Sequence, residues 1–440
     1  MLTRRPNHSC FIFSISRTSL LKSENQNVIQ LSNEAIKDKR ANERKVVLGF
    51  SGGLDTSFCV KYLSEERGYE VHSITVNTGG FSADELKEIE THATELGVKT
   101  HTSVDAVRSY YDSIIKYLVF GNVLKNNTYP LSVSAERLSQ ALHIAEHCKK
   151  LSADAVAHGS TGAGNDQVRF DMIFHIMIPG MEIITPIRDL KLSREQEIEY
   201  LKKKGVEMNF AKAVYSINKG LWGTSVGGKE TLTSFGMLPE EAWPTQVTKS
   251  GTQQVKLTFE KGELVSVDDN NFPHPSEAIK YLQAMAGPYG IGRDIHVGDT
   301  IIGIKGRVGF EAAAPMVIIK AHHALEKHVL TKWQLSWKDQ LAQFYGNWLH
   351  EGQILDPVMR DIESYLDNSQ RNVSGNVWVQ LMPYRFQILG IESRHDLMSS
   401  KFGKYGEMNM GWTGEDVRGF SKIFGNQTAI WHAIQKETEN

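Results

Sequence analysis

The sequence predicts an α/β protein, in which a doubly wound, mostly parallel sheet is followed by an α+β domain and a C-terminal helix. Short apolar runs alternate with helical patterns from Val46 to about Lys204, and this alternation is typical of a parallel sheet with helices on both faces. Two glycine-rich strings each follow one of the apolar runs directly. From Phe210 the helical periodicity fades and paired short strands begin, which indicates that a second domain starts there.

Composition limits the possible partners and compartments. The 440 residues include 49 basic and 51 acidic ones and carry a formal net charge of -2, so we expect neither a nucleic acid nor a membrane surface as a partner. Cys10, Cys59 and Cys148 are scattered and form no Cys-x-x-Cys pair, which favours the reducing cytoplasm. No apolar run of the sequence is long enough to cross a bilayer.

The chain divides into predicted parts, which are an N-terminal extension (1–43), the sheet domain (44–208), a second domain (209–410) and a C-terminal helical arm (411–440). In the extension, several arginines and serines precede the first acidic residue. Such a composition fits a transit peptide or a poorly ordered tail, and we expect a tail.

The first glycine-rich string organises the sheet domain. Val46 to Phe50 is an apolar run that predicts a buried strand, and Ser51-Gly52-Gly53 breaks it sharply. Leu54, Phe58 and Tyr62 then recur at helical spacing. The turn therefore lies at a helix N-terminus, where free backbone N–H groups and the helix dipole favour an anion. The two glycines let the backbone approach a phosphate with no Cβ in the way.

The side chains of this turn fit a phosphate as well. Ser51, Thr56 and Ser57 supply hydroxyl donors, and Asp55 can hold a cation that bridges phosphate oxygens. No lysine follows the glycines, so the string is not a Walker loop. Its order, S-G-G-x-D-[ST]-S, resembles the pyrophosphate loop of the ATP pyrophosphatases, which split ATP into AMP and pyrophosphate. The alternative is an ordinary glycine turn, capped by Ser or Thr, between a strand and a helix.

A second strand and helix follow this loop. Val71 to Asn77 predicts a strand that ends at a glycine turn, and the next helix begins at Ser82 and ends at Gly97. Val98 to Val104 is a further strand pattern. Ligands of doubly wound sheets bind beyond the carboxyl ends of the strands. Val76-Asn77 is therefore a candidate adenine and ribose edge, and the alternative is a plain strand end.

The second glycine-rich string runs from His158 to Phe170. Before it, we expect a helical stretch that carries Tyr129 to Arg137, a helix from Ala135 to Lys150 and a strand from Ala153 to Ala157. The string thus repeats the order of strand and glycine-rich turn.

Polar side chains of the second string can each fix part of a zwitterion. Asp166 can hold an ammonium, and Arg169 offers a planar fork for a carboxylate. Thr161 and Asn165 add neutral hydrogen bonds. The alternative is a solvated loop, and we favour a binding loop because three glycines are interleaved with this set.

The rest of the chain predicts mixed elements. They are, in order, a strand and turn over Ile183–Leu190, a helix from Ser193 to Lys204, a hairpin of Val255–Phe259 with Leu264–Val267, strands at Ile301–Ile304 and Met316–Ile319, a helix from His323 to about His350, a hairpin of Val377–Met382 with Arg385–Ile391, and a closing helix from about Glu415.

Two features of the long helix have ordinary explanations. His322, His323 and His328 match no zinc spacing that we can defend, so we expect no metal there. An apolar, tryptophan-rich face predicts core or a subunit interface rather than a cofactor site; it comprises Leu325, Val329, Trp333, Trp337, Leu341, Tyr345 and Trp348.

Three strings together resemble the argininosuccinate synthase family: SGGLDTS, GSTGAGNDQVRF and YSINKGLWGTS. The resemblance runs from Lys45 to near the C-terminus. It implies an enzyme that joins citrulline to aspartate at the expense of ATP and gives argininosuccinate, AMP and pyrophosphate. It also implies a homotetramer, in which a nucleotide-binding domain, a synthetase domain and a C-terminal helix that clasps neighbouring subunits follow one another.

The resemblance assigns roles to matching residues. ATP would contact Phe50, Ser51, Gly52, Gly53, Leu54, Asp55, Thr56, Ser57, Val76 and Gly159, with Mg²⁺ at Asp55. Aspartate would contact Thr161, Asn165 and Asp166, and citrulline would contact Tyr129, Ser134, Asn165, Arg169, Ser216 and Ser225. Asp55 and Asp166 would be the catalytic carboxylates.

Two positions depart from the family pattern. Gly298 stands where a citrulline-contacting Glu is expected, and Phe310 stands where a Tyr is expected. The first exchange leaves the citrulline ammonium without a carboxylate unless Asp299 or Glu311 substitutes, and the second removes a hydroxyl. This indicates either a divergent branch with rearranged contacts or an altered substrate. We favour the first, because the other citrulline positions match.

Other readings stay open at this point. The loop also suits an asparagine, GMP or NAD synthetase or a tRNA thiolase, and the chain could be an ATP-binding regulatory protein that has lost turnover. A thiolase usually needs paired cysteines, which this sequence lacks. A glutamine-using synthetase needs a nucleophilic cysteine or a partner amidase, and Cys59 and Cys148 fall in predicted helices.

Overall fold

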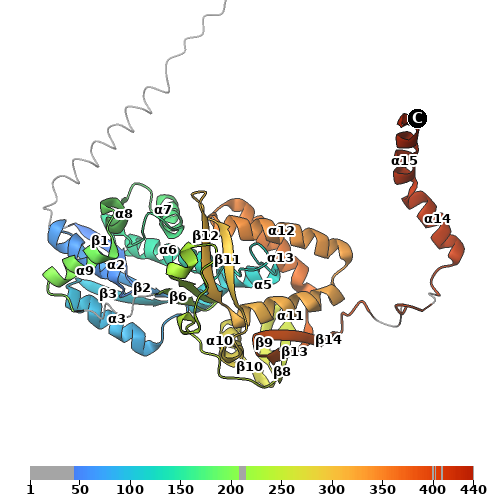
Figure 1. The fold of residues 1–440 in the computed structure, drawn as a ribbon, viewed down its shortest axis with the longest axis horizontal. Helices are drawn as coiled ribbons and strands as arrows, with labels where there is room; N and C mark the ends of the chain where they lie inside the picture. The colour runs from blue at the N-terminus through green and yellow to red at the C-terminus, as the bar shows by residue number, and fades with distance from the viewer. Residues whose placement is uncertain (1–43, 208–214, 399–400, 402, 408–409, 440) are drawn as a thin grey trace, which may run out of the picture.

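A parallel sheet forms the first part of the molecule, as the sequence predicts. The computed structural model describes residues 44–207, 215–398, 401, 403–407 and 410–439 (Figure 1), so the predicted N-terminal tail lies outside the described residues. The sheet has the order β3-β2-β1-β4-β5 with parallel neighbours. Its strands are β1 (Lys45–Gly49), β2 (Glu70–Asn77), β3 (Thr100–Asp105), β4 (Ala155–Ala157) and β5 (Glu182–Ile184).

Helices cover both faces of this sheet. They are α2 (Leu54–Lys61), α3 (Ala83–Leu96), α4 (Val107–Tyr110), α5 (Lys116–Phe120), α6 (Ser132–Leu151), α7 (Asp166–Met177), α8 (Pro186–Leu190) and α9 (Arg194–Lys203), with π-helical turns at Tyr62–Glu66 and Tyr111–Ile115. Successive residues of a strand point to opposite faces, and accordingly Val46 and Leu48 belong to one buried cluster and Val47 to another. The doubly wound prediction is confirmed.

The predicted helix ends are also confirmed by cap geometry. The Ser82 hydroxyl accepts from the Glu85 N–H, and the Glu85 side chain returns a bond to the Ser82 N–H. Gly97 ends α3 with φ 92°, a left-handed conformation that favours glycine. Ser193 caps α9 with the same reciprocal pattern through Gln196.

Two antiparallel sheets follow. One has the order β10-β9-β8-β13-β14 and contains both predicted hairpins; its strands are β8 (Gln253–Glu260), β9 (Glu263–Val267), β10 (Asn270–Asn271), β13 (Gly375–Met382) and β14 (Arg385–Glu392). The other has the order β11-β12-β7-β6; its strands are β6 (Ser216–Gly220), β7 (Gly223–Gly227), β11 (Arg293–Asp299) and β12 (Lys305–Glu311).

The helices of this part pack against the antiparallel sheets or extend from them. They are α10 (Pro275–Ala286), α11 (Ala313–Val329), α12 (Lys332–His350), α13 (Pro357–Ser369), α14 (Gly414–Phe424) and α15 (Asn426–Thr438), with 3₁₀ turns at Lys229–Leu232, Glu240–Ala242, Gly287–Tyr289 and Gln370–Asn372. The last two helices stand apart from the body (Figure 1) and bury no residue. Among the described residues, no helix is both long and apolar enough to span a membrane.

Three predictions of secondary structure are wrong. Ile301–Ile304 lies in the turn between β11 and β12, and Met316–Ile319 is part of α11, because a short apolar run cannot distinguish a strand from a buried helix. Residues 129–131 are not helical, since Tyr129 bridges to Lys125 and Leu131 has φ 64°.

The predicted helix from His323 to His350 is two helices. Thr331 separates them and starts α12 with a capping box through Gln334. The predicted apolar face is divided accordingly: Leu325, Val329 and Tyr345 are buried, but Trp333 and Trp337 are 68% and 59% exposed. The closing helix is likewise two, with a break at Gly425.

Candidate active site

Both glycine-rich strings leave the sheet at one edge. β1 and β4 are parallel neighbours, with Val46 opposite Ala155 and Leu48 opposite Ala157. The strand order reverses between them, which is where doubly wound sheets bind ligands. A Cβ added to Gly159 would lie 3.3 Å from the Asp55 Cβ and 3.4 Å from the Thr56 Cγ2. The two loops therefore touch, and only a glycine lets them come so close without displacement.

The first loop holds its shape through one carbonyl. Gly52 has φ 75°, and Gly53 is the N-cap of α2 without a side-chain cap. The Gly53 oxygen accepts from the Ser57 N–H at 3.0 Å, the Ser57 Oγ at 2.8 Å and the Thr56 Oγ1 at 3.2 Å. The first N–H groups of a helix have no intrahelical acceptor, so the start of α2 can receive an anion.

The predicted ligand hydroxyls of this loop differ in their surroundings. Ser51 is exposed, and its N–H donates to Thr56 Oγ1 at 3.4 Å. Ser57 is fully buried, and its hydroxyl lies 3.0 Å from the His92 Nε2 of α3 as well as bonding the Gly53 carbonyl. The Ser57 hydroxyl is therefore engaged within the protein.

Asp55 faces a second carboxyl that the sequence analysis did not single out, that of Glu197 on α9. Burial raises the pKa of Asp55, and burial together with the nearby Asp55 charge raises the pKa of Glu197 to about 8. Glu197 is 2% exposed, and its Oε2 has no hydrogen-bond partner among the described residues. The only sequence signal for Glu197 is its place in the acidic first turn of a predicted helix.

The candidate adenine edge at the end of β2 is closely packed. Val76 is 5% exposed. The Asn77 amide accepts from the Gly79 N–H at 2.9 Å and donates to the Phe81 carbonyl at 3.1 Å, so it fixes the glycine turn that follows.

Asp166, the first residue of α7, lies between two arginines. Arg137 donates to it from Nε and Arg169 from Nη1, both at 3.1 Å. Burial alone raises the pKa of Asp166, but the two guanidinium groups outweigh burial and leave the pKa below its ordinary value. Asp166 is therefore ionised at neutral pH. Arg137 belongs to a string that the sequence analysis quoted, but its role was missed.

Arg169 is 2% exposed, and its guanidinium group donates hydrogen bonds to other residues of the protein. Its Nη2 donates to the Ser134 hydroxyl at 3.0 Å and to the His350 carbonyl at 2.9 Å. The imidazole of His350 forms a hydrogen bond with the Ser134 hydroxyl as well, with 3.0 Å between Nδ1 and Oγ. Burial, followed by the charge of Arg169, lowers the pKa of His350 to about 3, so that ring is neutral.

A hydrogen-bond path connects the residues around Asp166 and Arg169 to the antiparallel sheet that contains β6 and β7. Arg137 donates to Asn218 on β6, and the Asn218 amide donates to the Ser225 hydroxyl on β7 at 3.4 Å. The structure thus brings Ser134, Asp166, Arg169 and Ser225 together. Among the described hydrogen bonds, Ser225 is connected to the other three only through Asn218.

The other predicted substrate residues, Tyr129 among them, lie outside that path. Thr161 and Ser216 are exposed. The Asn165 Oδ1 accepts from the Ile301 N–H at 2.8 Å, so the β11–β12 turn rests on the second loop.

Tyr129 accepts two hydrogen bonds. Its oxygen accepts from the Val133 N–H at 3.0 Å and from the Ser132 hydroxyl at 3.2 Å, and its own proton has no acceptor among the described residues. The ring stacks on His296 with centroids 4.9 Å apart and meets Phe310 edge-on at 5.3 Å.

The first departure from the family pattern, Gly298, has a local explanation, and nothing in the structure explains Phe310. A Cβ on Gly298 would lie 2.4 Å from the His296 Nε2, so the histidine ring fills the space of a side chain there. Asp299 pairs with Lys305 at 2.7 Å, and Glu311 accepts from the Thr245 hydroxyl at 2.6 Å. Both candidate substitutes for the missing carboxylate are therefore engaged elsewhere.

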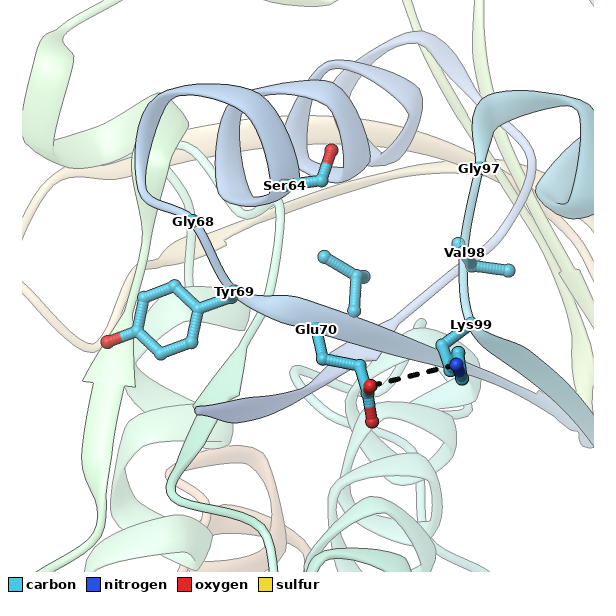
Figure 2. A pocket seen from close by; sticks show the side chains of 8 residues that line it. Ser64, Gly68, Tyr69, Glu70, Gly97, Val98 and Lys99 are labelled. Atoms are coloured by element: carbon cyan, nitrogen blue, oxygen red, sulfur yellow. Dashed lines mark ion pairs between the residues drawn. The ribbon is translucent and has the colours of Figure 1, made fainter. Parts of the chain in front are cut away.

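A hollow of about 430 Å³ lies at the other end of the sheet. Figure 2 shows Tyr69, Glu70 and Lys99 around it, and Glu70 and Lys99 form an ion pair at 3.9 Å. Glu70 begins β2 and Lys99 precedes β3, so this hollow borders the amino ends of the strands. It is not the site at their carboxyl ends.

Comparison with known proteins identifies the family. A model described as "Arginosuccinate synthase N-terminal HUP domain" matches residues 45–207, and "Arginosuccinate synthase C-terminal domain" matches residues 215–431. The argininosuccinate synthase of Methanocaldococcus jannaschii is 35% identical over 397 residues, which span 90% of this chain and 99% of that protein. That of Xylella fastidiosa is 36% identical over 407 residues, which span 90% and 99%. The chain belongs to the argininosuccinate synthase family.

Membership in this family accounts for the paired loops. Argininosuccinate synthases are ATP-using ligases that form argininosuccinate, and the chain is an enzyme of this kind. The two glycine-rich loops lie side by side where the strand order reverses between β1 and β4.

Proposed function

We propose that the chain condenses citrulline with aspartate through a citrullyl-adenylate, as a step of arginine biosynthesis, with both loops forming one catalytic site. The observation that carries this proposal is the close approach of Gly159 to Asp55 and Thr56, where even an added Cβ at residue 159 would lie only 3.3–3.4 Å from their side chains. That contact supports a nucleotide at the first loop within reach of an amino acid at the second.

ATP would lie along Phe50 to Ser57, with its adenine near Val76 and its phosphates at the start of α2. A divalent cation fits beside it, because the half-buried Asp55 faces the buried Glu197, and one Glu197 oxygen has no hydrogen-bond partner among the described residues. Mg²⁺ is typically held by one or two carboxylates together with substrate phosphates. When bound, Mg²⁺ supplies charge neutralisation for the phosphates.

The chemistry needs no covalent enzyme nucleophile. The ureido oxygen of citrulline attacks the α-phosphorus of ATP, and pyrophosphate leaves. The aspartate amine then attacks the ureido carbon, loses a proton, and AMP leaves as the carbon–oxygen bond breaks. Catalysis then consists of positioning and charge stabilisation by the loops.

The substrate contacts follow the second loop and its neighbours. Aspartate would lie at Thr161, Asn165 and Asp166, where the ionised Asp166 can orient the amine. Citrulline would contact a set of residues around the arginine and hydroxyl groups: Tyr129, Ser134, Asn165, Arg169, Ser216 and Ser225. Tyr129 would contribute its hydroxyl proton, for which the described part of the chain offers no acceptor.

We place the domain boundaries at residues 44–208, 209–410 and 411–440, and propose a cytoplasmic homotetramer. The C-terminal helices support assembly, since Phe420, Phe424 and Trp431 are 63%, 79% and 57% exposed and exposed apolar patches mark interaction sites. Cys59 and Cys148 are free thiols, which agrees with a reducing compartment.

Product analysis tests the proposed reaction. With citrulline, aspartate and α-labelled ATP, we expect AMP, pyrophosphate and argininosuccinate in equal amounts, and no AMP when citrulline is omitted. AMP formation with a different acceptor would favour another pyrophosphate-loop synthetase. ATP binding without AMP formation in a single turnover would favour a regulatory protein.

A further inference from the structure

His92 on α3 lies behind the phosphate loop and contacts it directly. Its Nε2 is 3.0 Å from the Ser57 hydroxyl, which in turn donates to the Gly53 carbonyl at 2.8 Å. The hydroxyl proton is committed to that carbonyl, so the imidazole must be the donor of the first bond. The result is a relay from His92 through Ser57 to Gly53.

The relay ends at the residue that shapes the anion site. Gly53 is the N-cap of α2 and has no side-chain cap of its own. The orientation of its peptide determines where the first N–H groups of α2 point, and these groups face an anion at a helix N-terminus. Because Ser57 is fully buried, water cannot reach the Gly53 carbonyl from that side and take over the hydrogen bond of the Ser57 hydroxyl.

The residues around His92 hold its ring in place as a hydrogen-bond donor. α3 also meets the loop through Ile89, whose Cγ1 would lie 3.3 Å from a Cβ on Gly52. The rings of His92 and Phe50 have centroids 6.2 Å apart. Burial lowers the pKa of His92, so the ring is neutral at pH 7 and carries a single N–H.

We propose that His92 is a positioning residue of the phosphate site: its Nε2–H holds Ser57, and Ser57 holds the Gly53 peptide in the orientation that receives the pyrophosphate part of ATP. This role deepens the proposed function and rests on the loop being the nucleotide site. Ser57 then acts from inside the protein, as a support rather than as a phosphate ligand.

The test compares His92→Leu with His92→Gln in the full chain, because glutamine keeps an N–H at similar reach. The readouts are the Kd of pyrophosphate and of α,β-methylene-ATP by calorimetry, the KM of citrulline, and Tm. We expect His92→Leu to raise both Kd values about three- to tenfold, as for the loss of one hydrogen bond, with the citrulline KM unchanged. His92→Gln should restore binding to near the wild-type level.

Controls separate the relay from general packing. His143→Leu removes another His–Ser contact, 3.2 Å from Ser109 Oγ, and should leave binding unchanged. In a Ser57→Ala background, His92→Leu should have no additional effect, because the acceptor is gone. The proposal is overturned if His92→Leu binds pyrophosphate like the wild type, or if His92→Gln weakens binding as much as His92→Leu does. It is also overturned if His92→Leu weakens binding just as much in the Ser57→Ala background.

A loop variant distinguishes this inference from the proposed function. Gly52→Val places a branched side chain at φ 75° against Ile89 and should abolish pyrophosphate binding. If Gly52→Val weakens binding and His92→Leu does not, the loop stays the nucleotide site and the role of His92 is wrong. If Gly52→Val also leaves binding unchanged, the loop assignment itself fails.

Discussion

Arg169 donates two hydrogen bonds to the carbonyl oxygen of His350, from Nε at 3.1 Å and from Nη2 at 2.9 Å, although 181 residues separate the two. His350 is the last residue of α12, and the C-terminal end of a helix attracts a cation. Arg169 stands near the start of α7, just after the second glycine-rich loop. The contact therefore joins the start of α7, next to the second glycine-rich loop, to the α+β part of the chain.

Arg169→Ala should weaken citrulline binding and lower stability together. The substitution removes one buried partner each from Asp166, Ser134 and the His350 carbonyl, and losing a charged partner in a desolvated site costs about 2–5 kcal/mol. We expect a lower Tm and a higher KM for citrulline, with a smaller effect on aspartate. Steady-state kinetics and thermal unfolding measure both. A raised aspartate KM with an unchanged citrulline KM would contradict the proposed citrulline contact.

Asp166→Ala should separate the two half-reactions. The carboxylate lies between Arg137 and Arg169 and is proposed to orient the aspartate amine, which takes no part in adenylation. We therefore expect citrulline-dependent exchange of labelled pyrophosphate into ATP to continue while argininosuccinate formation stops. Loss of the exchange reaction in a variant with an unchanged Tm would show that Asp166 acts in the first step.

Asp55→Asn should abolish turnover and leave the fold intact. Asparagine keeps the shape of the side chain but loses the charge that a cation bridging phosphates requires. Glu199→Gln on α9 is a matched control, because that carboxylate is exposed and pairs only with Lys203 at 2.8 Å among the described contacts. Activity is measured over a range of Mg²⁺ concentrations. Turnover near the wild-type rate at saturating Mg²⁺ would rule out the cation role.

Gly159→Ala should impair ATP use more than it impairs folding. The added methyl would stand 3.3 Å from the Asp55 Cβ, and overpacking of this kind costs about 1–3 kcal/mol. We expect a higher KM for ATP because the two loops are pushed apart. Gly164→Ala in the same loop is the control, since no described atom other than those of its chain neighbours lies within 4 Å of its added Cβ. Equal effects of the two substitutions would argue against the loop contact.

Polar substitutions on α14 should reduce assembly. Phe420 and Phe424 stack with centroids 5.2 Å apart on an otherwise uncovered helix, so burying them against another subunit is favourable. Light scattering after size-exclusion chromatography should show a smaller species for Phe420→Ser with Phe424→Ser. Lys422→Ser, on the same helix, serves as the control. A wild-type mass for the double variant would place the subunit contacts elsewhere.

The local patterns of the sequence predicted what depends on neighbouring residues. The strand, glycine turn and helix from Val46 onward, the caps at Ser82 and Ser193, and both hairpins of the antiparallel sheet follow from turn chemistry and periodicity. Their physical causes lie within a few residues, so a single sequence contains them. The parallel order of the sheet then placed the two glycine-rich loops at one edge.

The spacing of apolar residues predicted the wrong element where a helix is buried on nearly all sides, because polar residues no longer alternate with apolar ones there. Met316–Ile319 is apolar in succession because α11 is buried almost all round, and a run of that length looks like a strand. The predicted long helix is divided at Thr331, which caps α12. Apolar residues continue at helical spacing on both sides of Thr331, so their pattern does not show the division. Neither error affects the candidate site.

Only the tertiary structure decided which side chains face one another. His92 meets Ser57 across 35 residues, and Asn218 meets Arg137 across 81, while Glu197 reaches Asp55 because α9 packs on α2. Such pairs depend on how distant helices and sheets pack, and side-chain directions are not encoded in spacing along the chain. The sequence determined the loops and their chemistry, whereas long-range packing determined which residues support them.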